Sequence, residues 1–183
     1  MSLSGRQDDE PRASPAGPPA RPAGPGEIPE PIARLGRVHH VAMVVADLEA
    51  ALRTYRDLLG LPLESRYDLS ADGVRAAFLL AGPVRLEVIS PTVADNGVAR
   101  FLERRGEGLH HVCFEVTELA TTLDRLVATG VELIDPRPRH GALGPVAFLH
   151  PRSTNGVLVE LIEAPGGPAW PEFGQSAQAG EDV

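Results

Sequence analysis

The stretch Gly106-Glu-Gly-Leu-His-His-Val-Cys-Phe-Glu-Val116 contains a histidine pair, His110-His111, followed by an alternation of side chains that is typical of a β-strand. A second pair, His39-His40, stands upstream at the start of another alternating run. Two such strands in one chain suggest a duplicated unit whose copies bind one ligand together.

The duplication extends beyond the histidines. An offset of 71 positions aligns both pairs and also aligns Leu48 with Leu119. Near the end of each copy the offset is 73 and aligns Glu87 with Glu160, so two residues are inserted in the second copy. Each copy has the pattern strand, helix and three strands, which predicts an α+β fold of two tandem βαβββ modules.

Some local features of this prediction can be tested individually. Asp47 and Thr117 stand where the N-caps of the two helices are expected. In the second copy a strand is expected at residues 131–134, before a turn-rich segment at 136–145 that contains several Pro and Gly residues.

Domain limits follow from composition. Residues 1–34 are rich in Pro, Gly, Ala and charged residues, and residues 165–183 are similarly polar. Such segments cannot offset their loss of conformational entropy by burial, so we expect two flexible tails around one domain at 35–164. The two modules of that domain span about 36–91 and 106–163.

Charge and cysteine content exclude several classes of protein. The net charge of −8 argues against nucleic-acid binding, which depends on clustered Lys and Arg. A single cysteine, Cys113, excludes an internal disulfide framework and indicates a reducing compartment. The sequence contains no apolar run long enough to cross a membrane, and we expect a cytoplasmic protein.

Strand alternation selects the residues that face a shared cavity. Side chains on a strand alternate between its two faces, so only one histidine of each pair points inward. The face with the smaller and more polar residues selects His40 and His111, and the same logic turns Glu87 and Glu160 inward. Two imidazoles and two carboxylates predict a site for a divalent metal ion. The first histidine of each pair is expected to have a structural role.

Other reactive residue types have more ordinary interpretations. His140 and His150 lie in or beside predicted loops, as surface residues or substrate contacts. Cys113 is expected to be a small residue of the cavity wall, because no neighbouring base or cation would activate it as a nucleophile.

Three motifs resemble one enzyme family. They are Phe101-Leu-Glu-Arg-Arg-Gly-Glu-Gly-Leu-His-His-Val112, Gly73-Val-Arg75, and Ala147-Phe-Leu-His-Pro-Arg-Ser-Thr-Asn-Gly-Val-Leu-Val-Glu-Leu161. With the duplicated unit they resemble the vicinal oxygen chelate superfamily and, within it, the methylmalonyl-CoA epimerases. This resemblance implies that the two modules form one mixed sheet that curves into a cup. The resemblance covers residues 36–163.

This resemblance implies a reaction and a ligand set. A divalent metal, cobalt above all and otherwise zinc, nickel, manganese or magnesium, would bind His40, Glu87, His111 and Glu160. The family interconverts (R)- and (S)-methylmalonyl-CoA through a metal-stabilised enolate, and Glu160 and Glu87 would be the catalytic residues. The partners implied are an acyl-CoA substrate and a second copy of the chain in a homodimer.

The sequence departs from the family pattern at two places. Some relatives have Glu where this chain has Ala76, which leaves Glu87, Asp72 or a water molecule as the second proton-transfer group. In the loop at 139–145, Leu143 and Pro145 replace basic or polar residues. The arginines that remain for the phosphates of coenzyme A are Arg137, Arg139 and Arg152.

Three alternatives share this fold. A glyoxalase I-type lactoylglutathione lyase resembles the epimerases in its metal ligands, but the motifs of the second module favour the epimerases. A ring-cleaving dioxygenase uses two histidines and one carboxylate, so Glu87 would crowd its open positions. A non-enzymatic ligand-binding protein of the same fold typically lacks the four ligands.

Overall fold

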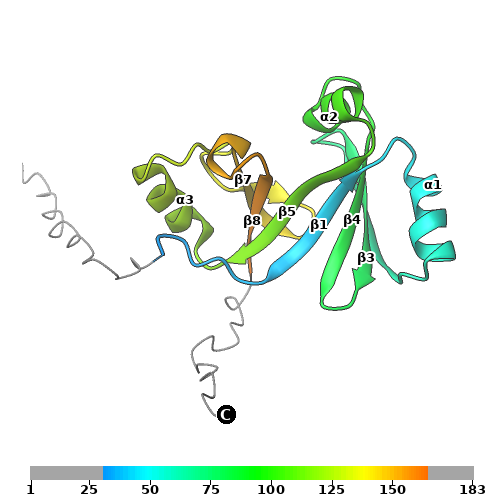
Figure 1. Ribbon diagram of the computed structural model, residues 1–183, viewed down its shortest axis with the longest axis horizontal. Helices are drawn as coiled ribbons and strands as arrows, with labels where there is room; N and C mark the ends of the chain where they lie inside the picture. Colours follow the sequence, from blue (N-terminus) through cyan, green and yellow to red (C-terminus); the bar gives the residue numbers. More distant parts are fainter. Residues whose placement is uncertain (1–30, 165–183) are drawn as a thin grey trace, which may run out of the picture. The chain divides into compact units, whose positions relative to one another are not determined.

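Both predicted modules are present in the computed structural model, which describes residues 31–164 (Figure 1). The first consists of β1 (Val38–Val44), α1 (Leu48–Leu52), the π-helix η1 (Arg53–Leu58), β2 (Leu63–Leu69), β3 (Val74–Ala81) and β4 (Val84–Pro91). After α2 (Gly97–Arg105), the second consists of β5 (Gly108–Val116), α3 (Leu119–Ala128), β6 (Arg139–Gly141), β7 (Gly144–Leu149), the 3-10 helix η2 (Pro151–Ser153) and β8 (Leu158–Glu163). Apart from residues 31–34, the two predicted tails lie outside the described residues.

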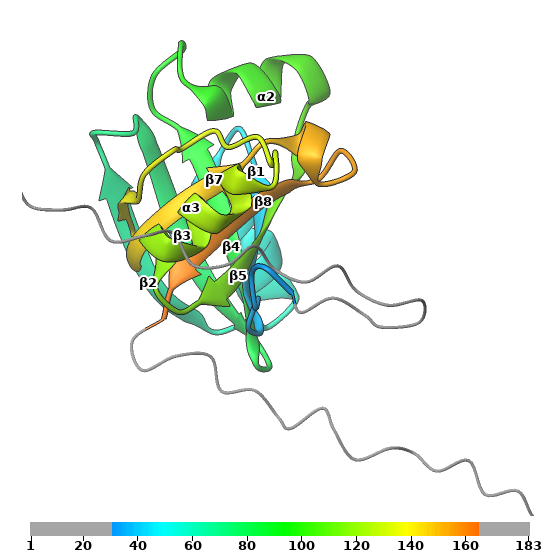
Figure 2. The ribbon, with the colours of Figure 1, turned by 90° about the vertical axis from the view of Figure 1, so that its left-hand side faces the viewer.

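The eight strands form one sheet in the order β2-β3-β4-β1-β5-β8-β7-β6. In each module the first strand pairs in parallel with the last, β1 with β4 and β5 with β8. The two modules meet where β1 and β5 pair antiparallel, in the centre of the sheet. The sheet curves around a concave face (Figure 2), so the predicted α+β class and curved cup are confirmed.

One helix of each module packs against its own strands. Leu48 and Leu52 of α1 are buried in a cluster with Ala77, Leu79 and Val88 from β3 and β4. In the second module Leu119 and Leu123 of α3 pack with residues of β7 and β8, which include Leu149, Val159 and Leu161. Each of these helices packs on the sheet through one apolar face. No helix among residues 31–164 is long and apolar enough to cross a membrane.

The linker helix α2 is attached to the turn between β2 and β3. Asn96 caps α2 by accepting from the backbone N–H of Ala99, and its side chain also donates to the carbonyl oxygen of Gly73 (2.7 Å). A Cβ atom at Gly73 would lie 2.4 Å from Cγ2 of Val93, and φ here is +65°. The glycine of the Gly73-Val-Arg motif therefore allows the close approach that positions α2.

Some local predictions were right and others wrong. Asp47 caps α1 as predicted, by accepting from two backbone N–H groups. The N-cap of α3 is Glu118 at φ 49° and not Thr117, whose carbonyl oxygen accepts from the hydroxyl of Thr122. The strand expected at 131–134 is reduced to a single bridge between Leu133 and Leu149. The backbone N–H of Phe148 donates to the side-chain carboxylate of Asp135 (3.0 Å) and is therefore not used to extend the pairing. The short strand β6 instead forms inside the segment expected to be turns.

Candidate metal centre

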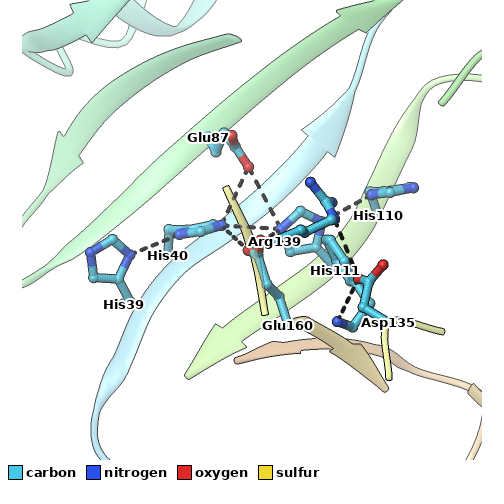
Figure 3. A network of polar contacts seen from close by, with 9 residues as sticks. His39, His40, Glu87, His110, His111, Asp135, Arg139 and Glu160 are labelled. Carbon is cyan, nitrogen blue, oxygen red and sulfur yellow. Dashed lines mark hydrogen bonds and ion pairs between the residues drawn. The ribbon is translucent and has the colours of Figure 1, made fainter. Parts of the chain in front are cut away.

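The four predicted ligands come from the four central strands of the sheet. His40 is on β1, Glu87 on β4, His111 on β5 and Glu160 on β8. The strand registers place all four on one face, since Ala42 pairs with both Glu87 and His111, and Cys113 pairs with both His40 and Glu160. All four side chains are buried, and Figure 3 shows them converging.

Three of the four donor atoms form a tight triangle. The Nε2 atoms of His40 and His111 lie 3.0 Å apart, and Oε2 of Glu160 lies 3.0 Å from each of them. Oε2 of Glu87 is farther away, at 3.3 Å from His40 Nε2 and 3.6 Å from His111 Nε2. The structure therefore brings all four together, with Glu87 as the more distant member.

This donor set fits a small divalent cation. Two ligands at right angles, each about 2.1 Å from an ion, lie about 3.0 Å apart, which is the edge of the observed triangle. Oε2 of Glu160 is buried and has no hydrogen-bond partner of suitable geometry among the described residues. A buried carboxylate oxygen without such a partner is costly unless a cation satisfies it. Imidazole and carboxylate together suit first-row divalent metals and magnesium.

Electrostatics at the site favour positive charge. Burial lowers the pKa of His40, but its contacts with Glu160 and Glu87 outweigh burial and raise that pKa to about 9. Burial raises the pKa of Glu160, but its contacts with His111 and His40 hold that pKa below its usual range. The site thus attracts a proton, or another cation, at neutral pH.

The first histidine of each pair does not follow the predicted alternation. Instead of packing among the apolar residues of the opposite face, His39 places its Nδ1 2.9 Å from Nδ1 of His40, and His110 places its Nδ1 2.9 Å from Nδ1 of His111. Burial, followed by the neighbouring histidine, lowers the pKa of each of these two side chains to about 4. Both are therefore neutral at physiological pH.

A cavity of about 1010 Å³ opens from the carboxylates and His111 toward α2. Four arginines line it: Arg100, Arg104 and Arg105 of α2, and Arg139 of β6. The α2 arginines were not selected from the sequence, because α2 is a linker between modules and only folding brings it over the site. Of the three arginines that were selected, Arg139 lines the cavity, where its guanidinium also contacts the carboxylates of Asp135 (3.3 Å) and Asp72 (3.5 Å). Arg137 and Arg152 are not among the lining residues, and Arg152 forms an ion pair with Glu132 (3.3 Å).

Known proteins are similar to this chain in sequence. A family model described as the Glyoxalase/Bleomycin resistance protein/Dioxygenase superfamily matches residues 39–148. The chain belongs to this superfamily. It is 39% identical to an ethylmalonyl-CoA/methylmalonyl-CoA epimerase of Cereibacter sphaeroides, over 69% of this chain and 97% of the relative. It is 38% identical to the mitochondrial methylmalonyl-CoA epimerase of Mus musculus, over 73% of this chain and 76% of the relative.

Solved structures of methylmalonyl-CoA epimerases are similar to this chain in fold. A methylmalonyl-CoA epimerase in complex with methylmalonyl-CoA and ammonium matches with a TM-score of 0.69 and 30% identity, over 74% of this chain and 99% of that one. Proteins described as probable lactoylglutathione lyases, from Arabidopsis thaliana and Vibrio cholerae, are less similar, at 27% and 24% identity. The similarity of the chain is thus greater to the epimerases of the superfamily than to these lyases.

Two aromatic rings of the site were missed in the sequence. Phe78 meets the ring of His40 edge to face at 5.5 Å, and Phe148 meets the ring of His111 in the same way at 5.1 Å. In the sheet Phe78 pairs with Glu87 and Phe148 with Glu160. The repeated Ala-Phe dipeptides at 77–78 and 147–148 are the signal that could have identified them.

Other candidates from the sequence are resolved by their positions. Cys113 lies between His40 and Glu160 in the sheet register, but its side chain is fully buried in a cluster with Val146 and Ile162 and is not among the residues that line the cavity. Burial raises the pKa of its thiol, which agrees with the expectation that it is not a nucleophile. Ala76 is buried and contributes no ionisable group. Asp72 lines the cavity, with its carboxylate 3.5 Å from Nη1 of Arg139.

Proposed function

We propose that this protein is an epimerase that interconverts (R)- and (S)-methylmalonyl-CoA. One observation carries the proposal: the order β4-β1-β5-β8 puts Glu87 and Glu160 on either side of the His40–His111 pair, within one buried site. Inversion of a carbon requires a proton to leave one face and another to arrive on the opposite face. The similarity to curated epimerases supports the same reaction.

We assign His40, His111, Glu160 and Glu87 as the ligands of a divalent cation. The resemblance favours cobalt, and zinc, nickel, manganese or magnesium are the alternatives. When bound, the cation supplies positive charge that stabilises negative charge developing on the oxygens of the substrate. The ionised carboxylate of Glu160 offsets part of the charge of the ion, and the two histidines are neutral in the bound state.

The two carboxylates move the proton. The C–H bond at C2 of methylmalonyl-CoA lies between a thioester and a carboxylate, and its electron pair passes into the thioester carbonyl when the proton leaves. Glu160, an anionic ligand in this assignment, accepts the proton that leaves C2. Glu87 faces the same histidine pair from the other module and carries a proton at this point, which it gives to C2 on the opposite side, in place of the group that Ala76 lacks. Exchange of both carboxyl groups with solvent then restores the starting state.

The arginines of the cavity are suited to an acyl-CoA. The whole chain carries a net charge of −8, yet Arg100, Arg104, Arg105 and Arg139 line one cavity with the site. Such a local concentration of positive charge attracts phosphate groups and raises the local concentration of an anionic substrate. We therefore assign these side chains to the phosphates of coenzyme A.

The assembly and location of the protein are part of the same proposal. The resemblance to a superfamily whose two-module members often pair favours a homodimer. A single buried cysteine supports a cytoplasmic location.

Hydrogen exchange at C2 tests the reaction. Protein loaded with Co²⁺ is incubated with methylmalonyl-CoA in D₂O, and deuterium at C2 is followed by mass spectrometry. We expect exchange at a catalytic rate and none with protein treated with EDTA. A parallel assay of lactoylglutathione formation distinguishes the lyase alternative. Lactoylglutathione formation without exchange at C2 would reject the epimerase.

A further inference from the structure

The first histidine of each pair occupies a β-bulge. Along the β1–β5 pairing the register passes from Val38–Phe114 to His40–Cys113, so β1 contains one additional residue, His39. At the other end it passes from Ala42–His111 to Met43–Leu109, so β5 contains one additional residue, His110. A bulge interrupts strict alternation and redirects a side chain. Each module thus uses one bulge to turn its first histidine toward its second.

The contacts that result are the same in both modules. Each pair has its Nδ1 atoms 2.9 Å apart, with ring centroids 5.2 Å apart and ring planes at 74° in His39–His40 and 70° in His110–His111. Two imidazole nitrogens at this distance share a single hydrogen, so that one nitrogen donates and the other accepts.

We propose that His39 and His110 are positioning residues, each accepting the Nδ1–H of the neighbouring histidine and so leaving Nε2 of His40 and His111 as a bare lone pair directed at the cation. A neutral imidazole carries one hydrogen, and a hydrogen held on Nδ1 is absent from Nε2. Partners of this kind orient metal-binding histidines and select their tautomer. The inference rests on the proposed cation site and does not depend on the substrate.

The two modules differ in the side chains that contact His39 and His110. Nε2 of His39 lies 3.4 Å from Nη1 of Arg85, whose guanidinium is also paired with Glu64 (2.6 Å). When Nδ1 of His39 accepts, the single hydrogen of its ring is on Nε2. This N–H then faces the guanidinium of Arg85, which can only donate, so the contact opposes the accepting role of Nδ1. His110 instead meets the ring of Phe101 from α2 at 4.9 Å. We therefore expect His110 to contribute more to cation binding than His39.

Variants at His110 separate the hydrogen bond from packing. His110→Phe keeps a ring against Phe101 but removes the acceptor, whereas His110→Asn keeps an acceptor near the Nδ1 position. Binding of Co²⁺ alone to the metal-free full chain is measured by competition with a chromophoric chelator. We expect His110→Phe to weaken binding about 10- to 100-fold, His110→Asn to restore most of it, and His39→Phe to have a smaller effect.

A direct readout follows the tautomer. In protein labelled with ¹⁵N-histidine and loaded with diamagnetic Zn²⁺, a nitrogen–nitrogen coupling across the hydrogen bond should join Nδ1 of His111, as the donor, to Nδ1 of His110. Unchanged Co²⁺ affinity in folded His110→Phe, or equal loss in His110→Phe and His110→Asn, would overturn the inference. If His110→Phe does not fold, the coupling in the unchanged protein decides, and its absence would overturn the inference. Absence of Co²⁺ binding to the unchanged protein would instead reject the proposed cation site, and binding without C2 exchange would reject only the epimerase.

Discussion

Replacing Glu160 with glutamine tests the centre most directly. The change keeps the size of the side chain but removes the negative charge whose Oε2 lies 3.0 Å from Nε2 of both His40 and His111. At an effective dielectric constant of about 20, unit charges at this separation interact by roughly 5 kcal/mol. That energy is large enough to account for the raised pKa of His40, so in Glu160→Gln this pKa should fall from about 9 toward its ordinary value.

The catalytic consequence is expected to be larger than a change in affinity alone. Loss of a positioned general base typically lowers a rate by about 10²- to 10⁴-fold, which corresponds to about 3–5 kcal/mol of activation free energy. The assay is deuterium exchange at C2 at saturating substrate, with the cation content of each sample measured alongside. Titration of the His40 ring by NMR in the metal-free protein checks the electrostatic part.

Glu163→Gln is the matched control, because Glu163 lies on the same strand, β8, but outside the cation site. It should retain full exchange and full cation content. The reasoning about Glu160 is refuted when Glu160→Gln keeps both its cation and its exchange rate, or when the two variants lose exchange equally.

Four further predictions concern stability and substrate binding. In EDTA-treated protein, the raised pKa of His40 contributes stability that is fully present below about pH 6.5 and is lost as pH rises toward 9, so the thermal midpoint should fall across this interval. Leu123→Ala removes a fully buried side chain of α3 and should lower the free energy of unfolding by about 2–5 kcal/mol in urea titrations. Asp47→Ala removes the N-cap of α1 and should lower it by about 1 kcal/mol in the same titrations. Arg104→Glu in α2 should raise KM for the acyl-CoA with a smaller effect on kcat, because Arg104 lines the cavity from α2 and is not one of the groups assigned to the cation or to proton transfer.

The fold and the four inward residues could be predicted because duplication repeats the same pattern twice. Alternation alone assigns faces only within a regular strand, and Glu87 and Glu160 lie where β4 and β8 pair without a register shift. Agreement between two copies then excludes most accidental matches. The same argument selected His40 and His111, which lie beside bulges and still point inward.

The bulges themselves could not be predicted from alternation. A bulge depends on how two strands distant in sequence align, and neither strand shows by its own residues where the extra residue will be. His39 and His110 were therefore assigned to the wrong face. The arginines of α2 were missed for a similar reason, because their proximity to the site depends on contacts such as Asn96 with Gly73, which exist only after both modules have folded.

The antiparallel pairing of β1 with β5 has a consequence for the integrity of the chain. Each module supplies only one histidine and one carboxylate, so a cation at this junction would be a reversible cross-link between the two halves, in addition to the β1–β5 pairing, the linker α2 and the ion pair between Asp72 and Arg139. A ligand present at 100 times its dissociation constant adds about 2.7 kcal/mol to the stability of the state that binds it. Cation supply would then contribute to how tightly the two halves hold together.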